Sequence, residues 1–291
     1  MPDGIYKKCL LCQESRPINI AEIYREGVFY RCLECGLMFA EPDVSNIERY
    51  YDSVWSDENS SCKPYNEKRE VSKRLNTADH LIDSIPRYRW VISELKKLSK
   101  GSNILDIGCG EGSILWAAKK LGHTPNGCEV SRNAVKIAKT LVETDNIIAG
   151  TLETEIYPNN TFDCVISLEV LEHLRNPRYF IETIAAILKP TGTLLLSTPN
   201  YYRGGAFAER MVHKPHSCTD YPPHHYSRWT AKTLKTALKR SFGEIRIGSI
   251  EYQASSPFKR IASKVFHALT FKKMGQSLFA VAKKPISYTS K

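Results

Sequence analysis

The chain has 291 residues, of which 42% are hydrophobic and 25% are charged, and its formal net charge is +10. This composition is typical of a folded globular protein with one large domain and one small one, and it excludes a disordered or fibrous chain. No apolar run approaches the roughly 18 residues of a membrane span, and the first residues lack the apolar core of a signal peptide. We therefore expect a cytoplasmic protein whose nine cysteines are thiols or metal ligands rather than disulfides.

The first notable feature in chain order is a pair of C-x2-C motifs. Their cysteines are Cys9, Cys12, Cys32 and Cys35. Each motif presents two thiolates from one turn, and two such turns complete the closed tetrahedral shell of a structural zinc site. Apolar residues on both sides of Glu26-Gly27 predict a short hairpin between the motifs. Because so short a segment buries little apolar surface, metal binding would supply much of its stability, and we predict a zinc ribbon over residues 1–45.

Residues 46–100 are predicted to form a helical linker or lid. A short amphipathic helix is expected around residues 47–55, followed by a polar loop, and residues 85–98 have a stronger helical pattern.

Residues 103–112 are the most informative stretch of the chain, because a short apolar run ends in Asp106 and is followed by glycines at alternate positions. The run predicts a buried parallel strand, and the glycines allow a sharp turn that approaches a ligand closely. Helical periodicity follows directly and ends at Gly122. A strand, a glycine turn and a helix in this order are typical of a nucleotide-binding unit.

The pattern D-x-G-x-G-x-G resembles the first motif of class I S-adenosylmethionine (SAM)-dependent methyltransferases, and four later segments agree with it in order. The second strand ends at Glu129, close to the roughly 20-residue offset of a ribose-binding carboxylate, and Ser131 then occupies a helix N-cap position. A third strand is expected at residues 147–150 and a fourth at 162–168. A helix over 177–188 is then broken by Lys189-Pro190-Thr191-Gly192 before a fifth strand at 193–198. Strands six and seven are predicted at 244–250 and 277–282.

The resemblance implies an α/β, Rossmann-like sheet of seven strands with helices on both faces, spanning residues 101–291 after the ribbon and the linker. It implies SAM as the cofactor. The residues that match its binding motifs are Asp106, Gly108, Cys109, Gly110, Glu129, Val130, Leu152, Glu153, Leu168 and Glu169. In this fold the leading helix often covers the cofactor, so Arg87, Tyr88 and Arg89 are candidates for contacting the SAM carboxylate.

The acceptor is expected where the strands end, beside residues 169–173 and the histidine-rich stretch that follows the fifth strand. Histidine can act as a general base near neutral pH, which methyl transfer to a hydroxyl requires. The segment Tyr221–Trp229 resembles the corresponding loop of small-molecule and sugar methyltransferases. Our candidates for the base are His225, then His224, then His173, and a purely structural role for the adjacent histidines is the alternative.

Glu169, Glu172 and His173 follow the spacing E-x-x-E-H, which resembles a divalent-ion motif of the ubiquinone-pathway O-methyltransferases. Many relatives of that group share these letters without a metal, so a metal-free role is the alternative.

The positive charge is concentrated in residues 201–291, which hold 17 basic and 4 acidic side chains. Such a region attracts anionic partners. Within it, residues 256–273 follow a basic amphipathic pattern, which suits either an interfacial helix at an anionic membrane surface or a helix packed on the sheet. The membrane alternative would make the protein peripheral to the inner membrane face.

Together these patterns predict a zinc ribbon joined to a SAM-dependent methyltransferase that acts on a small polar acceptor, with a sugar or glycan precursor and O-methylation favoured. The first alternative is an RNA methyltransferase that binds nucleic acid through the ribbon and the basic last third. The second is a non-catalytic binding module with a SAM fold. The sequence does not predict the oligomeric state.

Overall fold

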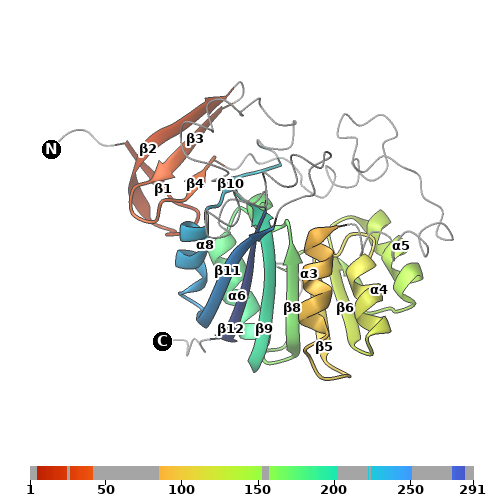
Figure 1. Cartoon of the computed structure of the whole chain (residues 1–291). Coiled ribbons are helices and arrows are strands. Elements are labelled where there is room, and N and C mark those ends of the chain that lie inside the picture. The colour runs from red at the N-terminus through yellow and green to blue at the C-terminus, as the bar shows by residue number, and fades with distance from the viewer. Residues whose placement is uncertain are drawn as a thin grey trace, which may run out of the picture.

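The computed structural model describes residues 5–24, 27–41, 85–152, 157–201, 222, 224–250 and 277–285. Figure 1 shows two sheets, a large one flanked by helices and a smaller one that lies at the upper left, above the side of the large sheet that ends in β11. The short amphipathic helix expected at 47–55 and the amphipathic segment 256–273 lie outside the described residues.

The large sheet has seven strands in the order β11-β12-β9-β8-β5-β6-β7. Its strands are β5 (Asn103–Ile107), β6 (Thr124–Glu129), β7 (Ile147–Ala149), β8 (Phe162–Leu168), β9 (Leu188–Pro199), β11 (Phe242–Ile250) and β12 (Ser277–Pro285). Strands β5 to β9 pair in parallel, whereas β12 is antiparallel to both of its neighbours, β11 and β9. Numbered within the sheet, this order is 6-7-5-4-1-2-3, and the α/β Rossmann-like prediction is confirmed.

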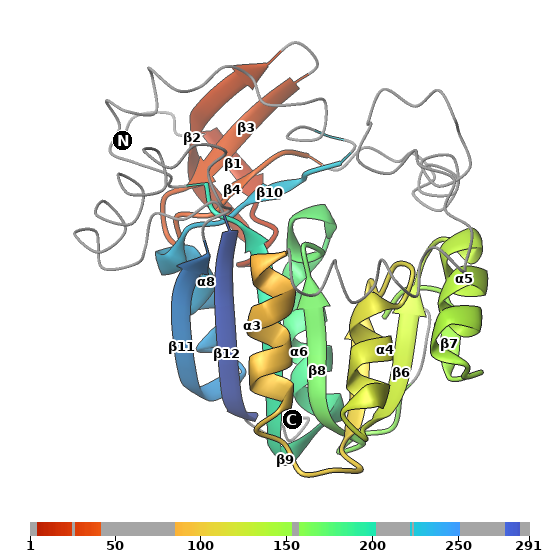
Figure 2. The same ribbon diagram turned by 45° about the vertical axis from the view of Figure 1, so that its right-hand side comes forward.

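Helices cover both faces of this sheet (Figure 2). One layer holds α3 (Pro86–Leu95), α4 (Ser113–Lys120) and α5 (Arg132–Val142), and the other holds α6 (Pro177–Ile187) and α8 (Ala231–Leu238). The helix starts follow local chemistry. Ser131 accepts a hydrogen bond from the Ala134 amide, as its predicted N-cap position requires, and Asn176 caps α6 in the same way.

The boundary between α6 and β9 differs from the sequence prediction. The helix ends one residue early, at Ile187, and Leu188 already has extended backbone angles. The stretch Lys189-Pro190-Thr191-Gly192 was expected to separate helix from strand, but it lies inside β9. The pairing of β8 with β9 shifts register between Phe162 and Cys164, so the irregularity that these residues cause is absorbed within the strand pair.

The smaller sheet contains the predicted hairpin, β2 and β3, and three strands that were not predicted, β1, β4 and β10. Its order is β1-β2-β3-β4-β10. The strands are β1 (Ile5–Lys8), β2 (Ser15–Tyr24), β3 (Gly27–Cys32), β4 (Met38–Phe39) and β10 (Ser227–Arg228). All neighbours are antiparallel, and β10 comes from the far end of the histidine-rich segment to pair with β4.

One hydrophobic core joins the two sheets. Leu11 and Leu37 of the cysteine turns and Phe39 of β4 are buried in the same cluster as Phe180 of α6 and Leu234 of α8. The amino-terminal segment is therefore packed against the large sheet and its helices.

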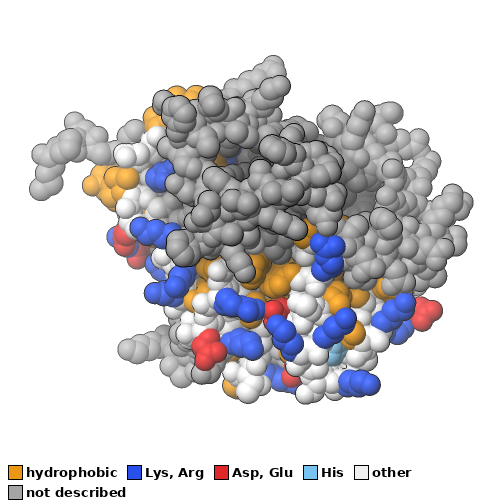
Figure 3. All heavy atoms as spheres, viewed as in Figure 1, with side chains coloured by type: hydrophobic (Ala, Val, Ile, Leu, Met, Phe, Trp, Pro, Cys, Tyr) orange, Lys and Arg blue, Asp and Glu red, His pale blue; other side chains and the backbone are white. Residues whose placement is uncertain are grey.

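On the face shown in Figure 3, basic side chains are scattered over the described part of the surface rather than gathered in one place. Of the 17 basic residues in the last third, nine lie outside the described ranges. Among the described residues, no helix is both long and apolar enough to cross a membrane.

Candidate functional site

The glycine turn after β5 has a backbone conformation that is unfavourable for residues other than glycine. Gly108, Gly110 and Gly112 all have positive φ angles, of 73°, 52° and 83°. A Cβ on Gly108 would lie 2.5 Å from Cγ2 of Val170, so this position also lacks room for a side chain. The amides of Gly108 and Cys109 both donate to the Cys128 carbonyl, which ties the turn to β6. The turn leads directly into the N-terminus of α4, where backbone N–H groups favour polar or anionic ligands.

Glu129 lies next to this turn. Its Oε2 accepts a hydrogen bond from the Gly110 amide at 2.9 Å, and its Oε1 accepts one from the Ser131 amide at 2.9 Å. The side chain is almost fully buried at the end of β6, and a carboxylate oxygen can accept more than one hydrogen bond. A carboxylate held in this way beside a glycine turn fits the ribose hydroxyls of a nucleoside.

Asp106 is buried at the end of β5. Burial raises the pKa of this carboxyl well above its usual range, and the nearby charge of Glu129 raises it further. Burial likewise raises the pKa of the Cys109 thiol, so this cysteine contributes to the turn as a neutral, buried side chain.

The remaining motif residues lie at the same edge of the sheet. Val130 directly follows β6, Leu152 is buried after β7, and Leu168 ends β8. Glu153 lies outside the described residues. These positions and the glycine turn together suit the nucleoside part of SAM. The hydrogen-bond donors and acceptors around Glu129 match those of the nucleoside.

Glu169 and Glu172 do not share one helix face, as a helical reading of E-x-x-E-H would require. Glu169 has a positive φ of 56°, and only Leu171–His173 form a single 3-10 turn, η2. The two carboxylates accept hydrogen bonds from neighbouring hydroxyls of β9, Glu169 from Ser197 at 2.7 Å and Glu172 from Thr198 at 2.9 Å. Burial raises the pKa of Glu172 well above its usual range, and the adjacent Glu169 raises it further.

The three candidate histidines lie together beside this turn. His173 Nδ1 lies 2.7 Å from the His224 carbonyl oxygen, to which it donates a hydrogen bond. The rings of His173 and His225 meet edge to face, with centroids 4.8 Å apart. Burial lowers the pKa of His173 to about 4 and also lowers the pKa of His224. Both histidines are therefore neutral at physiological pH.

A possible ligand set for a cation differs from the one that the sequence suggested. The ligand atoms of Glu172, His173 and His225 all lie within 4.8 Å of one another. Glu169 is not in this group. Sequence spacing alone could not identify His225 as a member, because it lies on a different segment from the other two.

Arg87 is the leading-helix candidate that lies near Glu172. Burial raises the pKa of Glu172, and the positive charge of Arg87 offsets part of that rise. Its guanidinium lies 5.5 Å from the ring centroid of Tyr88. The first turn of α3 therefore lies near the turn that follows β8. Arg89 occupies the same helix turn.

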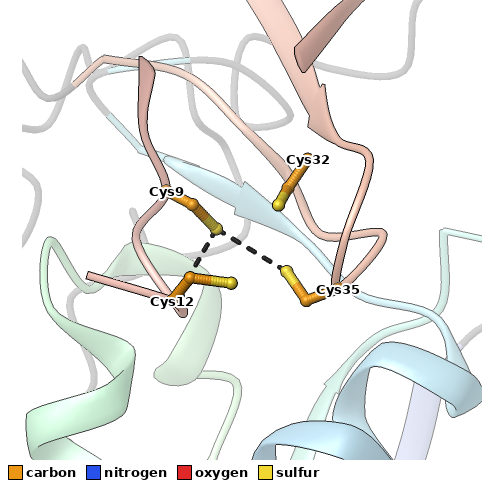
Figure 4. Close-up of side chains that lie close together, drawn as sticks. All are labelled: Cys9, Cys12, Cys32 and Cys35. Atoms are coloured by element: carbon orange, nitrogen blue, oxygen red, sulfur yellow. Dashed lines mark hydrogen bonds between the residues drawn. The ribbon is translucent and has the colours of Figure 1, made fainter. Parts of the chain in front are cut away.

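The four cysteines converge from two turns. Figure 4 shows the four side chains pointing toward a common centre. Their sulfurs all lie within 4.8 Å of one another, and Cys9 Sγ is 3.6 Å from Cys35 Sγ. Zinc–sulfur bonds of about 2.3 Å in a tetrahedron place sulfurs about 3.8 Å apart, so the donor set fits zinc. The hydrogen bond from the Cys35 thiol lowers the pKa of Cys9 to about 5, whereas burial raises the pKa of Cys12 to about 12.

Comparison with known families settles the class of the fold. The profile described as "Methyltransferase domain" matches residues 78–241, more than half of the chain. The chain belongs to this family.

Curated relatives of the methyltransferase domain are named ubiquinone biosynthesis O-methyltransferases. The protein of that name from Coxiella burnetii is 33% identical over 125 residues, which are 42% of this chain and 52% of the relative. The one from Xanthomonas campestris pv. campestris is 28% identical over 169 residues, which are 56% of this chain and 70% of the relative. The chain thus spans about half the length of the first of these relatives.

Solved structures show the same fold at low sequence identity. A chain from the complex between the Haloferax volcanii Trm112 methyltransferase activator and a methyltransferase has a TM-score of 0.53 at 18% identity, covering 76% of this chain and 98% of that one. A SAM-dependent methyltransferase from Mesorhizobium loti has a TM-score of 0.50 at 18% identity, covering 69% of this chain and 99% of that one. Together with the family match, they identify a class I SAM-dependent methyltransferase fold.

Sequence reasoning missed how the methyltransferase domain and the cysteine segment are joined. Nothing in Ser227-Arg228 indicates a strand, because two residues carry no periodicity. The bridge between Asn200 and Trp229, which holds the two ends of the histidine-rich stretch together, was also not predicted.

Proposed function

We propose that the protein transfers the methyl group of SAM to a hydroxyl of a small polar acceptor. The observation that carries this proposal is the placement of His173, His224 and His225 at the ends of β8 and β9, on the same edge of the sheet as the glycine turn and Glu129. The names of the curated relatives, which are O-methyltransferases, support a hydroxyl acceptor.

The residues on the cofactor side would bind SAM and orient it. When bound, SAM supplies a methyl group activated by a positively charged sulfur. Glu129 would accept hydrogen bonds from its ribose hydroxyls while remaining fixed by the Gly110 and Ser131 amides. Positive φ angles at the glycines let the backbone lie close to the ligand. In this arrangement the chain would position the methyl donor and would form no covalent bond with it.

On the acceptor side, we assign His225 as the general base. We assign His173 to holding the His225 ring in place by packing against it. A hydroxyl must lose its proton as it attacks, and a neutral imidazole can accept it. His173 is a weak base, because burial lowers its pKa to about 4 and its Nδ1 proton is held by the His224 carbonyl. His225 is partly exposed and packs against the His173 ring, so it can reach an acceptor.

We also propose that the four cysteines hold a structural zinc ion. Four thiolates leave no open coordination position, so the ion would stabilise the ribbon rather than take part in methyl transfer. The burial of all four cysteines and the spacing of their sulfurs support this role. We retain residues 1–45 as the ribbon, 46–100 as the linker and 101–291 as the methyltransferase domain.

A screen with methyl-labelled SAM tests the proposal. Phenolic quinone precursors, nucleotide sugars, lipid-linked glycans and RNA are offered to the whole chain, and label is expected on a hydroxyl of one of the small acceptors. Replacing His225 by Ala should leave affinity for S-adenosylhomocysteine unchanged and lower turnover by about 10²- to 10⁴-fold. His224→Ala tests the second candidate base and keeps the backbone carbonyl that holds His173, so its turnover should fall much less than that of His225→Ala.

Two outcomes would replace the proposal. Label found on RNA alone would favour a nucleic-acid methyltransferase, and no binding of S-adenosylhomocysteine would favour a non-catalytic module. Equal turnover in wild type and His225→Ala would reject that histidine as the base.

A further inference from the structure

The histidine segment and the ribbon share a strand. β10 begins two residues after His225, and its residues pair with β4 through Ser227–Phe39 and Arg228–Met38. The downstream end of the histidine segment is therefore part of the ribbon sheet, as Figure 2 shows for the strand that crosses above the large sheet. Any movement of the ribbon relative to the large sheet must displace this end.

Tyr226, which lies between His225 and β10, is bound on both sides. Its amide donates to the Glu172 carbonyl at 2.9 Å, and its own carbonyl accepts from the Ala40 amide at 2.9 Å. Its side chain is buried. One residue thus connects the ribbon to the turn that carries Glu172 and His173.

Arg228 fixes β10 through its side chain. The guanidinium forms an ion pair with Glu22 of β2 and lies 3.9 Å from the ring centroid of Phe29 and 5.1 Å from that of Tyr201. Only 9% of the side chain is exposed. A planar guanidinium can stack on rings and pair with a carboxylate at once, which the ammonium of a lysine does less well. Arg228 therefore contacts β2, β3 and Tyr201, which lies two residues after the end of β9.

Both cysteine turns also rest on the methyltransferase domain. The Cys12 carbonyl accepts from Arg178 of α6 at 3.3 Å, and the adjacent Gln13 side chain donates to Asn176, the cap of α6, at 3.0 Å. At the second turn, a Cβ on Gly36 would lie 3.6 Å from Thr233 of α8. The placement of the ribbon thus depends on the cysteine turns as well as on β10.

We infer that Arg228 is a positioning residue that sets the location of His224 and His225 by locking β10 into the ribbon sheet, and that metal binding at the four cysteines supports the same placement. The inference rests on the proposed function, because the histidines matter as acceptor-side groups. Its structural content can be measured without knowing the acceptor.

The test uses hydrogen exchange on the full, zinc-loaded chain. In Arg228→Ala, the Tyr226 amide should exchange about tenfold faster than in wild type, which corresponds to about 1.4 kcal/mol. The Gly110 amide and the affinity for S-adenosylhomocysteine should stay at wild-type values. Arg228→Lys should give an intermediate rate, because it keeps the charge beside Glu22 and loses the planar stack. Removing the metal with a chelator should accelerate Tyr226 exchange as Arg228→Ala does.

Arg16→Ala is the matched control, since Arg16 forms ion pairs with Glu14 and Glu34 within the same segment and does not belong to β10. If Arg228→Ala fails to fold, Glu22→Gln provides the same test with the arginine intact. The inference is overturned if Tyr226 exchanges at the wild-type rate in the folded variant. It is also overturned if Arg16→Ala gives the same acceleration, or if Gly110 exchange rises equally. An absence of methyl transfer in the substrate screen would refute the proposed function but would leave these exchange rates unchanged.

Discussion

Replacing Glu129 by Gln should weaken cofactor binding sharply while keeping the size of the side chain. In wild type both carboxylate oxygens accept backbone N–H groups at 2.9 Å. A glutamine has one oxygen and one NH2 group, so it must turn a donor toward the amide of Gly110 or Ser131. It also lacks the charge that strengthens hydrogen bonds from ribose hydroxyls.

The size of the effect follows from these contacts. A hydrogen bond to a charged acceptor contributes about 1.5–3 kcal/mol, and a glutamine oxygen can still accept one of the two hydroxyls more weakly. We expect a loss of about 2–4 kcal/mol, which raises the Kd between about 30-fold and about 1,000-fold.

Titration calorimetry with S-adenosylhomocysteine measures this change. Glu143→Gln is the control, because Glu143 lies 83% exposed in an ion pair with Lys119 at 3.2 Å and away from the glycine turn. A folded Glu129→Gln protein whose Kd stays within about threefold of wild type would refute the assignment of Glu129 to the ribose.

Three further expectations concern stability and metal content. Gly108→Ala should lower the free energy of unfolding in urea by at least about 1 kcal/mol more than Gly101→Ala, because both have positive φ but only the added methyl at Gly108 would clash with a valine 2.5 Å away; equal losses would contradict the clash. Cys35→Ser should reduce bound zinc, measured by mass spectrometry, from about one ion per chain, and wild-type zinc content in the variant would argue against the four-thiolate site. Because the pKa of His173 is lowered to about 4 in the folded chain and lies near 6.5 when unfolded, its contribution to stability is complete above pH 6.5 and is lost as the pH falls toward 4, by up to about 3 kcal/mol. His173→Gln should flatten this part of the urea stability profile, and an unchanged slope would contradict the lowered pKa.

Local patterns in the sequence predicted most of the large sheet, because each strand and helix there has its own signal. Apolar runs at β5 and β8 identified buried strands, and Ser131 identified the start of α5. The glycine turn could be predicted because glycines at alternate positions after Asp106 form a pattern that is recognisable in the sequence. The error at the end of α6 has a physical cause: a Lys-Pro-x-Gly stretch interrupts a helix, but the extended backbone that it allows can continue a strand just as well.

Sequence patterns predict contacts between neighbours along the chain better than contacts between distant segments. The four cysteines were predicted as a group because their spacing is regular. The proximity of His225 to Glu172 and His173, and the pairing of β10 with β4, depend on how distant segments fold together. No spacing rule covers either case.

The strands of the smaller sheet come from two distant parts of the chain, which affects how the sheet folds during synthesis. Residues 38–39 are made early, whereas the strand that covers their open edge is residues 227–228. Until the ribosome has passed that point, the nascent amino-terminal segment presents unpaired backbone groups and the apolar side of Phe39. Such a long-range closure slows folding and makes the new chain prone to aggregation. Early capture of zinc by the cysteine turns would limit that exposure.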